Sequence, residues 1–143
     1  MIDARLAPYG IFVSRVALGL MFIAHALLKY VVFTIPGFAA FLGQAGFPEV
    51  LAWPTVLAEL LGGVANVLGV YSRVVALALI PVLVGALLVH VPNGWLFTAA
   101  NGGWEYPAFL VVAAVSHVLT GEGAFALKPT VLPAAAVSAL KAA

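Results

Sequence analysis

Residues 11–33 read IFVSRVALGLMFIAHALLKYVVF, and this stretch decides the fold of the chain. A helix needs about 20 mostly apolar residues to cross the hydrocarbon core of a bilayer, and this stretch is long enough. It nevertheless contains Arg15, His25 and Lys29. Ionisable side chains at membrane depth are costly, usually face other helices or water, and mark a functional site by default. The stretch therefore predicts a retained membrane helix that carries part of a polar site.

The composition of the whole chain is that of a membrane protein. Of its 143 residues, 65% are hydrophobic and 8% are charged, whereas soluble domains contain about 45–50% apolar residues. A net charge of +1 with scattered Lys and Arg argues against a nucleic-acid partner, which would need a basic surface. The chain has no cysteine, so any redox chemistry would need a bound cofactor or a redox protein partner.

Four apolar segments are long enough to cross the bilayer, at about residues 8–33, 53–71, 73–91 and 104–121. They predict an all-α integral membrane four-helix bundle over residues 1–127, followed by a tail at 128–143. The first run is longer than the apolar core of a signal peptide, so we expect it to remain as an anchor. The turn at the junction of the second and third segments takes only residues 69–73, which predicts a tight antiparallel hairpin.

The distribution of Lys and Arg predicts the orientation. Residues 34–52 and 92–103, which connect the spans on one side, contain neither. Cytoplasmic loops are enriched in these residues, so both termini are expected in the cytoplasm with the turn at 69–73. All the tryptophans fall at the opposite, outer interface, where aromatic residues are common: Trp53, Trp95 and Trp104.

Helical spacing gathers the polar groups into two layers. At about 100° per residue, Arg15, His25 and Lys29 fall within an arc of about 80°. The rise of about 1.5 Å per residue predicts that one outer-leaflet cavity collects His25, Lys29, Glu59, His90 and Glu105. The same estimate predicts that a deeper layer, nearer the cytoplasm, holds Arg15, Asn66 and His117. On the second span, Gly62 and Gly69 are expected to let neighbouring backbones approach closely.

The outer residues also have structural interpretations. Lys29 could instead extend to the outer interface as an anchor. Glu59 lies too deep for that, and we expect it to pair with His25 or Lys29. Such a pair is either a ligand site or a bond that only holds the helices together. An interfacial role is the alternative for His90.

Structural interpretations also apply to the residues of the deeper layer and of the loops. Arg15 could be a structural partner of Asn66 and of helix carbonyls. His117 is expected to be a packed core histidine bonded to a carbonyl. The loop residues Glu49 and Glu122 are expected to be solvated.

Haem and other metals are not expected. His25 and His90 come nearest to the shared depth that axial haem ligands need, but the chain has no Cys-x-x-Cys-His attachment motif. The Glu-x-x-His spacing of carboxylate-bridged metal sites is absent as well.

Three short motifs, taken in order, resemble the DoxX family of small bacterial four-helix membrane proteins. They read Arg15-x3-Gly19-x2-Phe22-x2-His25-x3-Lys29, then Glu59-Leu60-Leu61-Gly62-Gly63 with Arg73, then Gly121-x-Gly123. The resemblance covers about residues 11–127. The sequence departs from the family pattern in two places: Ala26 stands where glycine is frequent, and residues 125–128 replace a common Ser-Leu-Asp ending.

The resemblance implies a component of the bacterial inner membrane linked to redox metabolism. Related proteins are associated with thiosulfate:quinone oxidoreductase, with terminal oxidases and with complexes for oxidative-stress defence. Carried over residue by residue, the family motif singles out Arg15, His25, Lys29, Glu59 and Arg73.

The polar cluster and the resemblance together favour a subunit that binds a quinone or a similar amphiphile. His25 and Lys29 would hydrogen-bond the quinone oxygens and Glu59 would handle protons, while Arg15, Asn66, His90 and Glu105 complete the expected binding residues. The alternative is a non-enzymatic membrane scaffold or a small-molecule permease. Glycine-rich helix faces and apolar loops are also compatible with a homodimer in the lipid bilayer.

Overall fold

The computed structural model describes residues 3–131, and this part of the chain is all-α. Its α-helices are α1 (Ala7–Leu27), α2 (Ile35–Gln44), α3 (Ala52–Leu68), α4 (Ser72–His90) and α5 (Glu105–Thr120). Short helical turns follow or precede them: η1 (Leu28–Val32), η2 (Glu49–Leu51) and η3 (Val91–Asn93). The described residues form no strand, only an isolated bridge between Val70 and Lys128. The predicted all-α fold class is confirmed.

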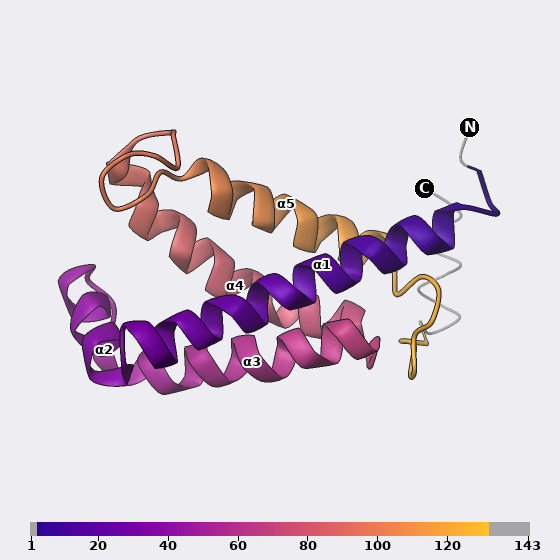
Figure 1. Cartoon of the computed structure of the whole chain (residues 1–143), viewed down its shortest axis with the longest axis horizontal. Helices are drawn as coiled ribbons and strands as arrows, with labels where there is room; N and C mark the ends of the chain where they lie inside the picture. The colour runs from indigo at the N-terminus through magenta and orange to yellow at the C-terminus, as the bar shows by residue number, and fades with distance from the viewer. Residues whose placement is uncertain (1–2, 132–143) are drawn as a thin grey trace.

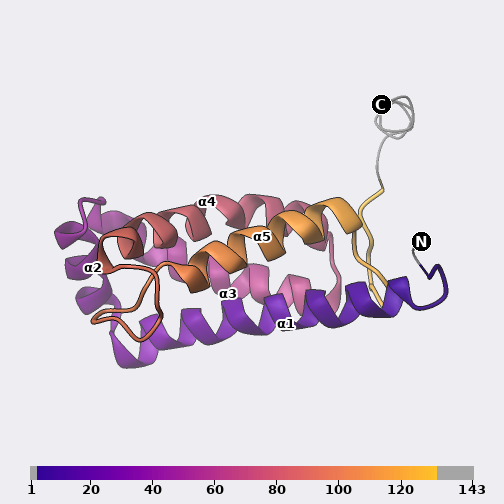
Figure 2. The same ribbon diagram turned by 90° about the horizontal axis from the view of Figure 1, so that it is seen from above.

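The four long helices run side by side along the long axis of the molecule (Figure 1, Figure 2). α1 packs against α3, α4 packs against α5, and contacts of α3 with α4 and of α1 with α5 join the two pairs. The short α2 and the loop before α5 lie together at one end of the molecule (Figure 1). The α3–α4 turn and the segment after α5 lie at the other end. We call these the α2 end and the turn end.

The helices agree with the predicted spans to within a few residues. Within residues 3–131, three helical stretches are long and apolar enough to cross a membrane: Ala7–Val32, Glu49–Leu68 and Ser72–Asn93. The helix α5 is apolar but shorter, with 16 residues, or about 24 Å at 1.5 Å per residue. Much of the outer surface is apolar as well, as at Leu61, which is 65% exposed. A lipid environment suits such a surface.

Proline and glycine residues begin and end helices at the positions expected from the sequence. Pro8 lies in the first turn of α1, where its missing N–H leaves no helical bond unmade. Gly69 ends α3 with a φ of 68°, a left-handed conformation that glycine adopts readily. Only Gly69, Val70 and Tyr71 separate α3 from α4, which confirms the tight antiparallel hairpin.

Gly19 of α1 and Gly63 of α3 let the backbones of these two helices approach closely. A Cβ atom added at Gly63 would lie 2.8 Å from the carbonyl oxygen of Gly19, and one at Gly19 would lie 2.7 Å from that of Gly63. The expected backbone contact at Gly62 is wrong, because Gly62 faces the side chain of Leu79 on α4. Gly69 does approach another backbone closely, at Ala126.

Substituting Gly63 by alanine is expected to destabilise the protein by about 1–3 kcal/mol, because a buried methyl group with no room forces the backbones apart. Gly85→Ala on α4 is the matched control, since an added Cβ there meets nothing within 4 Å. Thermal unfolding in mild detergent, followed by circular dichroism, compares the two. Equal midpoints for both variants would contradict this packing.

The segment after α5 is bonded to the α3–α4 turn. Leu127 N–H donates to Leu68 O at 3.1 Å, Lys128 N–H to Gly69 O at 3.0 Å, and Tyr71 N–H to Lys128 O at 2.8 Å. The first residues of the predicted 128–143 tail therefore contact the helical body. Residues 132–143 of that tail lie outside the described part of the chain.

Candidate functional site

Lys29, in the turn η1 that continues α1, forms an ion pair with Glu59 of α3 near the α2 end. Lys29 Nζ lies 2.8 Å from Glu59 Oε1 and 2.7 Å from Oε2. Their side chains are only 16% and 6% exposed, respectively. Glu59 therefore has a partner, as expected, and the partner is Lys29. Lys29 is mostly buried in this pair and does not act as a surface anchor.

Two local features position Lys29. It lies in η1, a π-helical turn in which Phe33 N–H donates to Leu28 O at 3.1 Å, and such turns are frequent at functional sites. The buried ring of Phe38 on α2 lies 5.5 Å from Lys29 Nζ. α2 therefore helps to cover the ion pair.

His25 lies one helical turn before Lys29 and stacks on an aromatic ring of α5. Its Nδ1 is 2.8 Å from Met21 O. Because a carbonyl only accepts, Nδ1 carries the hydrogen, and in the neutral ring Nε2 is an acceptor. The ring lies 5.7 Å from that of Tyr106, with an interplanar angle of 21°.

Tyr106 is a residue of this region that the sequence did not single out. Its hydroxyl is buried and has no hydrogen-bond partner. In the sequence, Tyr106 lies among residues typical of a helix start, so nothing in the pattern indicated a role. Only the stacking on His25 brings it to the candidate site.

His90 and Glu105 have local partners at the same end. His90 Nδ1 is 2.7 Å from Ala86 O, and Glu105 Oε1 accepts the N–H of Phe97 at 2.8 Å. Within residues 3–131, neither forms a hydrogen bond with Lys29 or Glu59. Their convergence with the ion pair on one outer cavity stays a prediction, as does the absence of haem.

Arg15 forms a buried clamp near the turn end. Its Nη1 donates to Asn66 O at 2.8 Å and to Val67 O at 3.0 Å, and Nη2 donates to Ala124 O at 3.0 Å. Arg15 is 0% exposed. The last carbonyls of a helix lack partners within it and attract a cation. The predicted structural contact of Arg15 with Asn66 and helix carbonyls is confirmed.

The other two expected inner residues, Asn66 and His117, are both buried. Asn66 contributes its backbone oxygen to Arg15, while its side-chain amide is buried with no partner. His117 is buried, but its Nε2 lies 3.0 Å from the hydroxyl of Ser72. The expected carbonyl partner of His117 is therefore wrong. A hydroxyl at the start of α4 could not be anticipated from either helix alone.

Glu122 is buried, so the expectation of a solvated loop charge is wrong. It is 7% exposed, and its Oε1 accepts the N–H of Arg73 at 3.2 Å and of Thr130 at 3.1 Å. Burial acts to raise the pKa of Glu122, but the hydrogen bonds from Thr130 and Arg73 outweigh it and lower the pKa. Glu49, by contrast, is exposed as expected.

The depressed pKa of Glu122 predicts acid sensitivity at the turn end. Its stabilising contribution is complete above the unfolded-state pKa, about 4.3, and is lost as the pH falls through the lower folded-state value. The protection factors of the Arg73 and Thr130 amides in hydrogen exchange, corrected for the intrinsic rate at each pH, should therefore fall below about pH 4. In Glu122→Gln this acid step should disappear. An acid step that persists unchanged in the variant would assign it to another group.

Comparison with known proteins identifies the family. The DoxX profile matches residues 10–92, more than half of the chain. A Bacillus subtilis (strain 168) protein named putative oxidoreductase CatD is 30% identical over 122 residues, which are 85% of this chain and 87% of the relative. No solved structure is significantly similar to the chain. Together with its long apolar helices, these matches show that the chain is a membrane protein of the DoxX family.

Proposed function

We propose that this protein is a subunit of the bacterial inner membrane that binds a quinone or a similar amphiphile and works with a redox partner protein. In this proposal α1, α3, α4 and α5 cross the membrane as a four-helix bundle with both termini in the cytoplasm. The charge distribution supports this orientation, since the connections at the α2 end contain no Lys or Arg. The name of the Bacillus subtilis relative, putative oxidoreductase CatD, supports the link to redox chemistry.

The observation that carries the proposal is the buried ion pair of Lys29 and Glu59 beside two unsatisfied polar groups. Within the described residues, His25 Nε2 has no protein partner, and the hydroxyl of Tyr106 is buried without one. A buried hydroxyl such as that of Tyr106 is normally hydrogen-bonded, and His25, which is partly buried, has an acceptor nitrogen free at Nε2. A bound molecule with both acceptor and donor oxygens would satisfy them, and a quinone and its quinol offer these two kinds of oxygen.

The side chains have complementary roles in this mechanism. The Lys29 ammonium and the Tyr106 hydroxyl are donors and would bind quinone oxygens. The neutral His25 ring would accept a proton from a quinol hydroxyl at Nε2. The Glu59 carboxylate would take the second proton once Lys29 turns towards the ligand. The electrons released by the quinol would pass to the partner protein.

His25→Ala should weaken quinone binding by about tenfold, which is the loss of one hydrogen bond of roughly 1–1.5 kcal/mol. Decylubiquinone is titrated into protein in phosphatidylcholine nanodiscs, and quenching of tryptophan fluorescence is measured. The exposed Glu49→Gln variant is the control. A wild type without saturable quenching, or a His25→Ala variant with unchanged affinity, would refute the proposal.

A scaffold or permease without redox activity is the second candidate. It is favoured by the ion pair itself, because both oxygens of Glu59 are already satisfied by Lys29. On this reading the pair only joins α1 to α3. Purification in mild detergent separates the candidates: a quinone in the preparation supports the first, and a stoichiometric partner protein with no bound quinone supports the second.

A further inference from the structure

We propose that a groove between α1 and α5 at the turn end binds a neutral membrane amphiphile, such as a lipid with an uncharged hydroxyl or carbonyl head. This site lies at the opposite end of the molecule from Lys29 and Glu59. The inference rests on the membrane placement proposed above and is independent of quinone binding.

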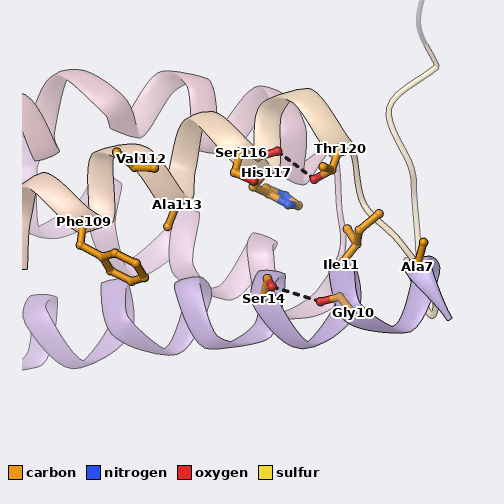
Figure 3. Close-up of a pocket in the computed structure, with 10 residues that line it drawn as sticks. All are labelled: Ala7, Gly10, Ile11, Ser14, Phe109, Val112, Ala113, Ser116, His117 and Thr120. Atoms are coloured by element: carbon orange, nitrogen blue, oxygen red, sulfur yellow. Dashed lines mark hydrogen bonds between the residues drawn. The ribbon is translucent and has the colours of Figure 1, made fainter. Parts of the chain in front are cut away.

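The groove is open to the surroundings of the protein, and small residues form much of its lining. Its volume is about 470 Å³, within the range of about 300–1,000 Å³ common for ligand pockets. Side chains of α1 and α5 face one another across it (Figure 3). On the α1 side, a Cβ atom added at Gly10 would meet nothing within 4 Å. The space beside Gly10 is therefore not filled by the protein itself.

The inner wall of the groove carries a buried polar group without a partner. His117 is 3% exposed, and its ring lies between the two helices (Figure 3). The Ser72 hydroxyl lies 3.0 Å from His117 Nε2, whereas His117 Nδ1 is buried and has no hydrogen-bond partner. Because the Ser72 hydroxyl can either donate to Nε2 or accept from it, Nδ1 can be the acceptor or the donor. His117 therefore suits a ligand oxygen of either a hydroxyl or a carbonyl group.

The hydroxyls in the groove add acceptors and no charge. Ser14 donates to Gly10 O at 3.1 Å and Thr120 to Ser116 O at 2.8 Å, as the dashed lines in Figure 3 show. Each hydroxyl oxygen keeps lone pairs for a ligand. Among the lining residues there is no Lys, Arg, Asp or Glu, so an ionised head group would find no counter-charge. A neutral head group fits this lining best.

The surroundings of the groove suit an apolar chain. Phe109 and Val112 line it and are 68% and 65% exposed. In the proposed orientation this surface faces the hydrocarbon of the bilayer, from which a lipid can enter sideways. The occupant we infer is therefore a membrane lipid with its head at His117 and its chain along Phe109 and Val112.

The test uses 1-monooleoylglycerol as the neutral probe, added to ¹⁵N-histidine-labelled full-length protein in phosphatidylcholine nanodiscs. The His117 ring signals, assigned by their loss in His117→Gln, should shift saturably, while those of His25 and His90 should not. Gly10→Leu, which fills the groove, should abolish the shift. Gly85→Leu should retain it, because the space at Gly85 is equally open but lies on α4. Ser14→Leu provides a second groove-filling variant if Gly10→Leu does not fold.

Several results would overturn the proposal. One is a His117 signal that does not move in folded wild-type protein, and another is a shift that survives in the groove-filling variants. Equal shifts with oleate would refute the preference for a neutral head. Loss of a dimer in Gly10→Leu, with no response to the probe, would assign the groove to a second copy of the chain. Because quinone binding is read from tryptophan fluorescence at the α2 end, the two proposals fail independently.

Discussion

Glu59→Gln is expected to destabilise the protein by about 3–5 kcal/mol, because it leaves the Lys29 ammonium buried without a counter-charge. The pair is only 16% and 6% exposed, so water compensates little of this loss. The ring of Phe38, 5.5 Å from Lys29 Nζ, offers a weak cation–π contact but no counter-charge. The free energy of unfolding is measured by denaturant titration in detergent, followed by circular dichroism.

The matched control removes both charges. Replacing a buried ion pair by apolar residues of similar volume is often neutral or stabilising. Lys29→Met combined with Glu59→Leu should therefore recover most of the stability lost in Glu59→Gln, and a double-mutant cycle with the two single variants gives the coupling energy. A double variant as unstable as Glu59→Gln would show that packing, and not charge, accounts for the effect.

Arg15→Met is expected to have a similarly large effect at the turn end, about 3–5 kcal/mol. It removes three charge-assisted hydrogen bonds, each of which contributes roughly 1.5–3 kcal/mol, and their effects are not additive. The stability of Arg15→Lys should lie between that of Arg15→Met and that of the wild type. Its ammonium keeps the charge but cannot reproduce the planar fork of a guanidinium.

The loss of the Arg15 hydrogen bonds should also loosen the segment after α5. The bond of Arg15 to Ala124 O ties this segment to α1, and the neighbouring Glu122 is buried in the wild type. Cleavage after Glu122 by a glutamate-specific protease should therefore accelerate in Arg15→Met. The exposed Arg5→Met variant should match the wild type. Unchanged cleavage after Glu122 in Arg15→Met would contradict the clamp.

The helices and the main polar contacts follow from local sequence. Long apolar runs with Pro8 at one end and Gly69 at another predict the helices, because length and turn chemistry are local properties. The pairing of Glu59 with Lys29 and of Arg15 with helix carbonyls was also predictable. Charged groups this deep in apolar segments have few other ways to be satisfied.

The contacts that the sequence missed depend on how separate helices are rotated against each other. A shift of one residue along α3 moves the close contact from Gly62 to Gly63, and the sequence pattern does not resolve it. Glu122 is buried only because Thr130 and the start of α4 fold around it. Tyr106 joins the candidate site by stacking on His25 across two helices.

The most direct test of the central claim is the affinity for decylubiquinone of the Lys29→Met, Glu59→Leu double variant. This variant should remain folded while losing both charged groups of the proposed site. We predict saturable tryptophan quenching in the wild type and none in the double variant at the same unfolding midpoint. Equal affinity in both proteins would show that the buried ion pair only holds α1 and α3 together and takes no part in binding.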